Sequence, residues 1–385
     1  MKQKALTILL LLFTIFPIGR IVWQKWDYYL SPFDLKRAQG LYNISQYVKG
    51  EGASWIADEI VLAYASWNYI NGGSPILLNP DYPPLGKYIV GSSIYLFNNE
   101  KLPNLFFSFA SLFAFFLLSR LVLKNICLSL IPVALLSWER LFSEQLLFVP
   151  LFETFVFTFL ILATYFFVKG LKNNNYFILS SLFLGCFWAT KPWMMAVPLV
   201  LAYAVYLLII KKGIKKFIFW SFSLPMAVIV ILISYLKLFL EGWNFYKVLS
   251  VQKWIMWYHS SKLLGFGSVW PFIYLNRWYV WWGDKPFLPI AQWTVAWPVF
   301  LTLALICCLA VALKHFGLKN KLTGLVEPEN IIYIICLQVI CYLGFYTFGY
   351  MSTRYIFYFM PFCYLLGVYF LVSIIQWKKL LKSLF

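Results

Sequence analysis

The sequence predicts an all-α integral membrane protein: a multi-pass helical bundle of about 10–11 transmembrane helices with interfacial helices on the outer face. Of its 385 residues, 62% are hydrophobic and only 12% are charged, whereas soluble domains carry about 25% charged residues. The apolar residues form runs of about 20, the length with which a helix crosses the hydrocarbon core. This composition excludes a water-soluble enzyme, a disordered chain and a disulfide scaffold.

The spanning helices are expected where the apolar runs lie. These are near residues 6–23, 103–123, 126–138, 147–169, 174–190, 192–210, 217–239, 291–313, 331–349 and 355–376. The first run follows the basic start MKQK, and no small-residue cleavage site comes after it. It is interpreted as an uncleaved signal anchor with a cytoplasmic N-terminus. The cysteines fall inside apolar runs and are interpreted as small core residues.

The basic residues set the orientation of the predicted bundle. With ten spans, the short basic connections all fall on the side of the N-terminus; they contain Lys124, Lys169, Lys172, Lys211, Lys212, Lys215, Lys216, Lys314, Lys319, Lys321, Lys378, Lys379 and Lys382. This side is expected to be cytoplasmic, so the net charge of +18 needs no nucleic-acid partner. The run 83–97 is too short to span and would break the alternation. It is expected to form an interfacial helix on the outer face.

This topology places two long segments outside, residues 24–102 and 240–290, as outer-face loops of one domain over residues 1–385. Of the 14 acidic residues, only Glu327 and Glu329 are expected to be cytoplasmic. The sequence contains no GxxxxGK[ST] motif and no GxGxxG motif between a strand and a helix, which are the patterns that bind nucleotide phosphates. A site built from carboxylates is therefore expected to face the outside.

The first outer segment carries three candidate carboxylates. Asp58 and Glu59 are adjacent at the start of a predicted helix, and adjacent helical side chains point about 100° apart. At most one of them therefore aims at a given substrate, and capping of the helix start is the alternative role. Asp81 and Lys87 flank a Pro-Pro corner. The corner either directs both side chains toward one cavity or only stiffens the loop.

Further charged residues are expected where the chain meets the outer membrane surface. Glu144 and Glu153 lie where the chain re-enters the membrane, and ionisable groups at that depth are costly. Lys191 closes an apolar helix and either snorkels to the interface or binds an anion. The basic residues expected to neutralise a phosphate on this face are Lys87, Lys191, Arg277 and Arg354.

The second outer segment, QKWIMWYHSSKLLGFGSVWPFIYLNRWYVWWGD, is dense in Trp and Tyr and contains His259 and Arg277. Such a segment is either an aromatic belt at the membrane interface or a platform for a sugar and its phosphate. His259 alone does not indicate catalysis.

Several motifs, taken in order along nearly the whole chain, carry a family resemblance. They are the acidic pair Asp58-Glu59, the block PPLGK at 83–87, an acidic residue after the third span, GCFWATK ending at Lys191, the aromatic loop with YHSS and WPFIYLNR, and TRYIFYFMP. In these motifs the sequence resembles the protein O-mannosyltransferase and aminoarabinose-transferase superfamily. Its members are multi-pass, lipid-phosphate-sugar-dependent glycosyltransferases of the GT-C fold, similar to glycosyltransferase family 39.

The resemblance implies inverting transfer of a sugar from a polyprenyl-phosphate donor to an extracytoplasmic acceptor, which would be a lipid, a glycan or a protein hydroxyl. Asp58 would be the general base, with Glu59 beside it. The second acidic residue would be Glu153 or Glu144, and the distance from Glu153 to its helix end fits the family better. The lipid phosphate would be held by Lys87, Lys191 and Arg354. Substrate contacts are assigned to Tyr64, Tyr82, His259, Trp270 and Tyr358.

The sequence departs from the family pattern at Tyr82, where the protein mannosyltransferases typically have His. Asp81 is the remaining candidate ligand for a divalent metal, and no other cofactor is expected. The chain resembles a compact prokaryotic member in the inner membrane, without the luminal repeat module or the extra C-terminal domain of larger members. A multi-pass transporter or lipid flippase is the alternative function, and a non-catalytic member of the fold is a third.

Overall fold

The computed structural model describes residues 2–50, 54–210, 213–260, 266–279, 287–317, 330–349 and 351–384. This part of the chain is helical almost throughout, which confirms the all-α prediction. One antiparallel sheet pairs β1 (Trp278–Tyr279) with β2 (Phe287–Leu288). Some residues named in the sequence analysis lie outside the described residues or side chains. They are residues 261–265 and 280–286, Lys211, Lys212, Lys319, Lys321, Glu327, Glu329, Lys378, Lys379 and Lys382.

Long apolar helices make up the body of the protein. In the described ranges, six are long and apolar enough to cross a membrane: Lys4–Gln24 of α1 (Lys2–Gln24), α7 (Leu102–Leu123), α10 (Glu153–Gly170), Gly213–Ser234, α18 (Ala296–His315) and Ile331–Phe348 of α20 (Asn330–Phe348). A seventh span results if α8 (Ile126–Ser137) and α9 (Arg140–Leu147), bent by 62° at their junction, are taken together. Three apolar helices are shorter: α11 (Tyr176–Trp188), Trp193–Ile209 and Met360–Ile375.

Each of the ten predicted segments coincides with one of these apolar helices, and within the described residues six of them have the length and composition of a span. Several of the helices are bordered by breaks in the chain. The elements next to the breaks are η1 (Trp193–Ala196) before α12 (Val197–Ile209), η2 (Thr353–Tyr358) before α21 (Met360–Leu384), and the series α13 (Gly213–Ser223), α14 (Pro225–Ser234) and α15 (Leu236–Leu240). Each break leaves backbone N–H and C=O groups without helical partners, and charged side chains lie beside several of these ends.

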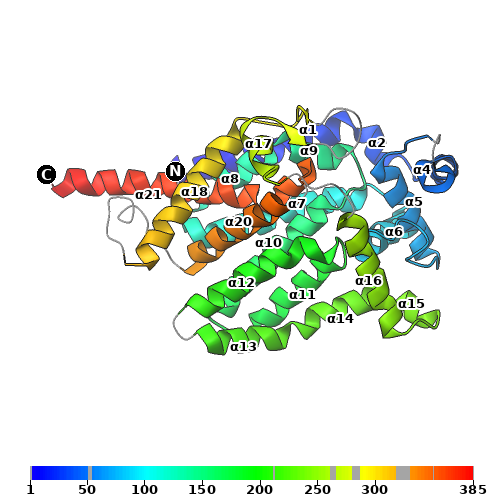
Figure 1. Ribbon diagram of the computed structural model, residues 1–385. Helices are drawn as coiled ribbons and strands as arrows, with labels where there is room; N and C mark the ends of the chain where they lie inside the picture. The colour runs from blue at the N-terminus through cyan, green and yellow to red at the C-terminus, as the bar shows by residue number, and fades with distance from the viewer. Residues whose placement is uncertain are drawn as a thin grey trace.

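The short helices gather at one end of the bundle. Figure 1 shows α2, α4, α5, α6 and α15 at the end opposite to both termini. The elements between α1 and α7 are α2 (Trp26–Leu30), α3 (Leu35–Asn43), α4 (Gln46–Lys49), α5 (Asp58–Ile70) and α6 (Leu85–Phe97). The helix α6 has 13 residues, too few to span a membrane, and it packs against α5. We call the end with α2–α6 the site end.

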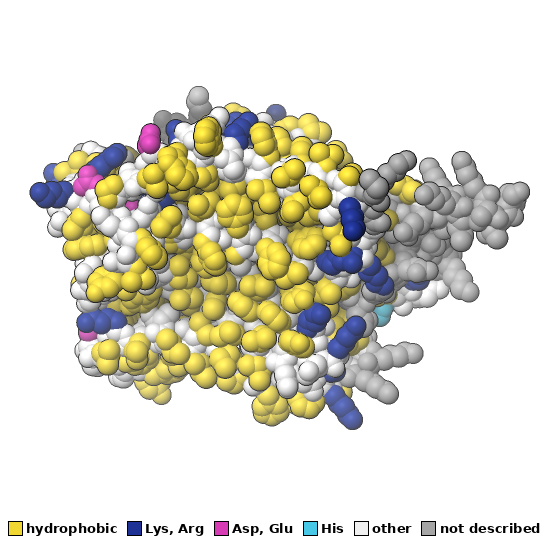
Figure 2. Space-filling model, turned by 180° about the vertical axis from the view of Figure 1, so that it is seen from behind, with side chains coloured by type: hydrophobic (Ala, Val, Ile, Leu, Met, Phe, Trp, Pro, Cys, Tyr) yellow, Lys and Arg dark blue, Asp and Glu magenta, His cyan; other side chains and the backbone are white. Residues whose placement is uncertain are grey.

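Charge is divided between the two ends of the bundle. Figure 2 shows a continuous hydrophobic surface across the middle of the molecule, with Lys and Arg at both ends and a larger group of them toward the end that carries the termini. On this face Asp and Glu are visible only at the site end. This distribution agrees with the charge pattern expected for a membrane protein whose basic end is cytoplasmic.

Buried side chains join the helices that border the candidate site. The helix α10 lies in the core and packs against α7 and α11. On α20, Gln338 is fully buried, and its Nε2 donates to Thr164 Oγ1 of α10 at 2.7 Å. Tyr203 of α12 donates to the same oxygen at 2.9 Å. Hydrogen bonds of this kind hold helices together in an apolar surrounding, so α12 and α20 are both fixed to α10.

Candidate functional site

The first ion pair of the site joins Asp58 to Arg354. Asp58 is the first residue of α5, where a carboxylate interacts favourably with the helix dipole. Arg354 belongs to η2, and its Nη1 lies 2.8 Å from Asp58 Oδ2. The Asp58 side chain is 43% exposed and that of Arg354 is 30% exposed. The pair therefore brings two distant motifs together while leaving the carboxylate accessible.

The second ion pair is buried. Glu153 is the first residue of α10, and Lys191 lies in the break between α11 and η1. Glu153 Oε1 and Lys191 Nζ are 2.7 Å apart, and the side chains are 2% and 4% exposed, respectively. Within the described residues, Glu153 Oε2 is buried without a hydrogen-bond partner. A buried polar atom without a partner is uncommon and is often found at a functional site.

Tyr82 lies between the two ion pairs. Lys191 Nζ is 4.2 Å from the centroid of the Tyr82 ring, a cation–π contact. Burial raises the pKa of the Tyr82 phenol, and the negative charge of Asp58 adds to this effect while Arg354 opposes it. Tyr82 therefore stays neutral at physiological pH. We call Asp58, Tyr82, Glu153, Lys191 and Arg354 the charged cluster.

Lys87 is fully buried next to the charged cluster. Its ammonium donates to the carbonyl oxygens of Asn79 and Tyr82, the latter at 2.8 Å, and to Tyr69 Oη at 3.3 Å. Burial lowers the pKa of Lys87 to about 7, and the charge of Asp81 opposes this shift. Since Lys87 donates to two carbonyl oxygens of the loop that carries Tyr82 and to Tyr69 of α5, it holds that loop against α5. This placement differs from the phosphate contact expected from the sequence.

Asp81 lies in the loop before the Pro-Pro corner, beside Asn79 and His259. Its Oδ1 accepts a hydrogen bond of 2.7 Å from Asn79 Nδ2. His259 Nε2 lies 3.4 Å from the Asp81 carbonyl oxygen, not from its carboxylate. In the part of the chain that the structure describes, no three His, Cys, Asp or Glu side chains are arranged to hold a metal ion. The metal-binding role expected for Asp81 therefore stays a prediction.

The remaining candidate carboxylates point elsewhere. Glu144 accepts hydrogen bonds of 2.9 Å on both oxygens from Gln292 Nε2, and it lies 3.9 Å from Arg140 Nε. The second acidic residue of the charged cluster is therefore Glu153. Glu59 lies on the side of Tyr28, whose pKa is raised to about 12 by burial and by the charges of Glu100 and Glu59. Asp58 and Glu59 thus face different neighbours, as their spacing predicts.

The candidate aromatic residues fall into two groups. Tyr358, beside the charged cluster, stacks between Phe187 and Tyr342 at centroid distances of 5.7 and 5.8 Å. Its hydroxyl is buried with no partner in the described ranges. The other candidates pack on aromatic residues outside the charged cluster, and Tyr64 lies 5.1 Å from the ring of Tyr42 in α3. Tyr64 stacks on Trp67 at 6.2 Å, Trp270 stacks on Tyr274 within α17 (Val269–Tyr274) at 6.4 Å, and Arg277 is exposed after α17.

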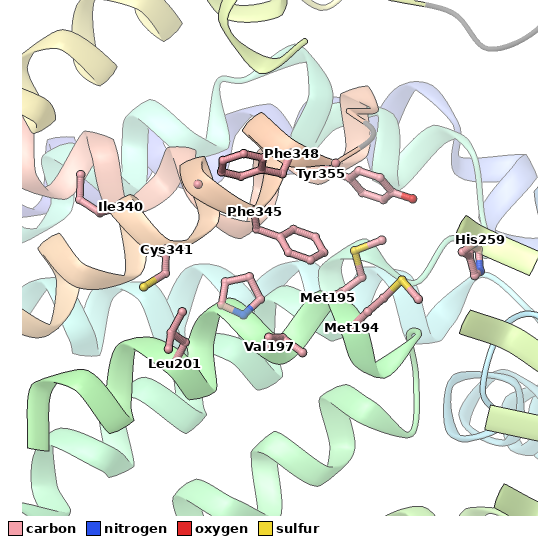
Figure 3. A pocket seen from close by; sticks show the side chains of 13 residues that line it. Met194, Met195, Val197, Leu201, His259, Ile340, Cys341, Phe345, Phe348 and Tyr355 are labelled. Carbon is pink, nitrogen blue, oxygen red and sulfur yellow. The ribbon is translucent and has the colours of Figure 1, made fainter. Parts of the chain in front are cut away.

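An apolar groove of about 630 Å³ opens beside the charged cluster. It lies between η1 and α12 on one side and α20 on the other, and we call it the α12–α20 groove. In Figure 3, His259 and Tyr355 lie toward one end and Leu201, Cys341 and Ile340 toward the other. Tyr355 follows Arg354 directly, and Met194 and Met195 line the groove shortly after Lys191. The groove is therefore lined by close chain neighbours of Arg354 and Lys191.

Two tyrosines near the cluster were not among the sequence candidates. Burial raises the pKa of Tyr47, with contributions from the charges of Asp58 and Asp81 and from Tyr258. Tyr258 lies on α16 (Phe245–Ser260) and stacks on Trp254 at 5.3 Å. The aromatic motif around His259 contained a signal for Tyr258. Nothing in the sequence around Tyr47 distinguishes it from an ordinary loop residue.

No protein-family model matches this chain, and no curated protein matches it in sequence. The resemblance carried by the short motifs therefore stays a prediction, and a function for this chain is argued from the geometry of the site.

Proposed function

We propose that the protein is an inverting glycosyltransferase that moves a sugar from a polyprenyl-phosphate donor to an acceptor outside the cytoplasm. One observation carries this proposal: the apolar α12–α20 groove is lined by Tyr355, the residue after Arg354, and by Met194 and Met195, which follow Lys191 closely in the chain, and both basic residues are held in ion pairs. A ligand that fits both parts has a long apolar chain and an anionic head. A lipid phosphate has this chemistry, and a soluble nucleotide sugar does not.

In this proposal Arg354 and Lys191 bind the lipid phosphate. A guanidinium has five N–H donors in a planar fork, and among the described residues Asp58 is the only side chain that Arg354 is seen to hydrogen-bond. Its remaining donors match the oxygens of a phosphate. Lys191 contributes a buried charge whose position is fixed by Glu153 and by the Tyr82 ring. Fixed positive charge stabilises the leaving phosphate as its negative charge develops.

Asp58 is proposed as the general base. The acceptor hydroxyl oxygen forms a bond to the anomeric carbon while its proton moves to the Asp58 carboxylate. The bond between the anomeric carbon and the phosphate oxygen breaks, and the electron pair leaves with the polyprenyl phosphate. Asp58 suits this role because its carboxylate is partly exposed and is held in place by its ion pair with Arg354. A base must lie within hydrogen-bond reach of the proton that it removes.

The position of the charges favours transfer over transport. Transporters place ionisable residues near the middle of the membrane, often in repeated halves of the chain. Here Asp58 and Glu153 are the first residues of their helices, and Lys191 follows the last residues of α11. A site at helix ends suits a reaction at the membrane surface.

The proposal is tested by sugar transfer in membranes that contain the wild type or Asp58→Asn. Radiolabelled polyprenyl-phosphate sugars are supplied, and the label is measured in lipid, protein and glycan fractions. We expect Asp58→Asn to lower the transfer rate by about 10²- to 10⁴-fold, the usual contribution of a general base. Glu144→Gln is the matched control, because Glu144 contacts Gln292 and not the cluster. Undiminished transfer by Asp58→Asn, or no transfer by a correctly inserted wild type, would contradict the proposal.

A further inference from the structure

A second apolar cavity, of about 440 Å³, lies between α11, α14 and α16. Trp188 and Trp193 form one wall, Val228 and Leu232 of α14 another, and Leu249 and Met256 of α16 a third. The mechanism above does not use this cavity. Neither the sequence motifs nor the candidate residues pointed to it.

The second cavity and the α12–α20 groove are lined by neighbouring residues of the same two elements, η1 and α16. In η1, Trp193 lines the second cavity, whereas the next residue, Met194, lines the groove. On α16, Met256 lines the second cavity, and His259, nearly one turn later, lines the groove. Since Trp193 and Met194 follow Lys191 by two and three residues, both spaces are lined by close chain neighbours of a residue in the charged cluster.

The second cavity opens on a surface that is apolar. Val228, Leu249 and Met256 line it and still keep 44%, 46% and 40% of their surfaces exposed. Val228 belongs to the helix Gly213–Ser234, which has the length and composition of a membrane span. A cavity in the side of such a helix is reached from the lipid bilayer and not from water.

The polar groups around the second cavity are suited to an anionic ligand. Lys253 lines it with an exposed side chain, and among the described residues no acidic side chain lines it. In the described part of the chain, Trp188 Nε1 is buried without a hydrogen-bond partner, and the Gln252 amide lines the cavity close to the Tyr235 hydroxyl. Lys253, Trp188 and Gln252 all carry N–H donors. Anionic oxygens, such as those of a phosphate, complement them.

We propose that the second cavity binds the acyl chain of an anionic membrane lipid, and that this lipid is the acceptor of the sugar. The inference rests on the proposed function and names the class of its acceptor: an acyl lipid whose phosphate-bearing head group carries a free hydroxyl. Lys253 lies six residues before His259 on α16, about 9 Å by the helical rise. In this proposal the head group is held at Lys253 and its hydroxyl is presented to Asp58.

The first test identifies the labelled product in native membranes. After transfer of labelled sugar, we expect the label in a lipid that survives mild acid, which cleaves the polyprenyl-phosphate donor, and that loses its chains in mild alkali, which cleaves acyl esters. Label in protein, or in a second acid-labile polyprenyl product, would overturn this proposal while leaving the proposed function intact. If neither the wild type nor any variant consumes the donor, the proposed function itself is contradicted.

Paired tryptophan variants test the cavity itself. Val228→Trp fills the second cavity, whereas Ile229→Trp, at the neighbouring position with 46% exposure, does not line it. We expect Val228→Trp to raise the KM for the lipid acceptor at least tenfold with little change in the KM for donor. Equal KM values for the two variants would overturn the proposal. Lys253→Gln, which disturbs no packing, is expected to raise the acceptor KM in the same way.

A binding measurement keeps the proposal testable without catalysis. Native mass spectrometry of the purified full chain with added phosphatidylglycerol is expected to retain this anionic lipid in the wild type and Ile229→Trp, and to lose it in Val228→Trp. Phosphatidylcholine is the zwitterionic comparison. Equal retention of both lipids, or equal retention by all variants, would overturn the assignment of the cavity to an anionic lipid.

Discussion

Glu153 and Lys191 show how two charges are kept inside an apolar bundle. Removing a carboxylate and an ammonium from water is expensive, and only close pairing and hydrogen bonding offset the cost. Their 2.7 Å contact and the Tyr82 ring supply this compensation. A purely structural pair would be replaceable by apolar residues. A pair that binds substrate would not.

Single and double variants separate these two roles. Glu153→Gln and Lys191→Met each leave one buried charge unpaired, and each is expected to destabilise the protein by about 3–5 kcal/mol. The double variant Glu153→Gln/Lys191→Met removes both charges and is expected to recover most of the lost Tm in detergent. Its transfer activity should stay low, because the leaving phosphate has lost Lys191. Recovery of activity together with Tm would show that the pair is only structural.

The sequence indicated which charged residues belong to the site, but not which atoms each of them contacts. Asp58, Glu153, Lys191 and Arg354 were identifiable because charges are rare in so apolar a chain and each lies at the end of an apolar run. Lys87 shows the limit of such reasoning. Its acceptors are mainly backbone carbonyls of a folded loop, and no residue type in the sequence marks a carbonyl that points inward.

Helix breaks create the site at the scale of elements. Hydropathy identified all ten apolar segments, since it depends only on composition along the chain. It did not detect the 62° bend between α8 and α9 or the division of residues 213–240 into three helices. Such bends depend on packing against other elements. The α12–α20 groove was unpredictable for the same reason, because its walls come from helices more than a hundred residues apart.

The groove can be narrowed at Gly344 of α20. This glycine lines the groove, and a Cβ built on it meets no atom within 4 Å. Gly344→Leu should therefore fold normally and displace part of a bound polyprenyl chain. Losing contact with about two methylene groups costs about 1.6 kcal/mol, which is roughly tenfold in affinity. We expect the KM for a long-chain donor to rise by this factor.

Two comparisons isolate the effect of Gly344→Leu. A donor with a truncated chain should keep its wild-type KM, because it does not reach the filled part of the groove. Gly19→Leu in α1, where a Cβ also meets nothing within 4 Å, should change neither KM. If the long and short donors respond equally to Gly344→Leu, the lipid chain does not lie in this groove.

At the scale of the whole molecule, the proposals require the site end to face away from the cytoplasm. Asn71 ends α5 at the site end, and Asn173 lies in the turn between α10 and α11, next to Lys172. Both side chains are exposed. From Asn71 to Asn173 the chain passes through α7, the bent pair α8–α9, and α10. If each crosses the membrane once, the two residues lie on opposite sides.

Labelling with a membrane-impermeant maleimide tests this topology. Asn71→Cys should react in intact cells, and Asn173→Cys should react only after permeabilisation, because short basic turns stay in the cytoplasm. The wild type is the background control, since its free cysteines are buried or half-buried. The reverse pattern would place Asp58 in the cytoplasm and rule out an extracytoplasmic acceptor. If both residues react from the same side, α8 and α9 form a re-entrant hairpin and do not cross the membrane. The number of crossings between Asn71 and Asn173 would then be even, and the one-sided placement of the basic turns would need a different explanation.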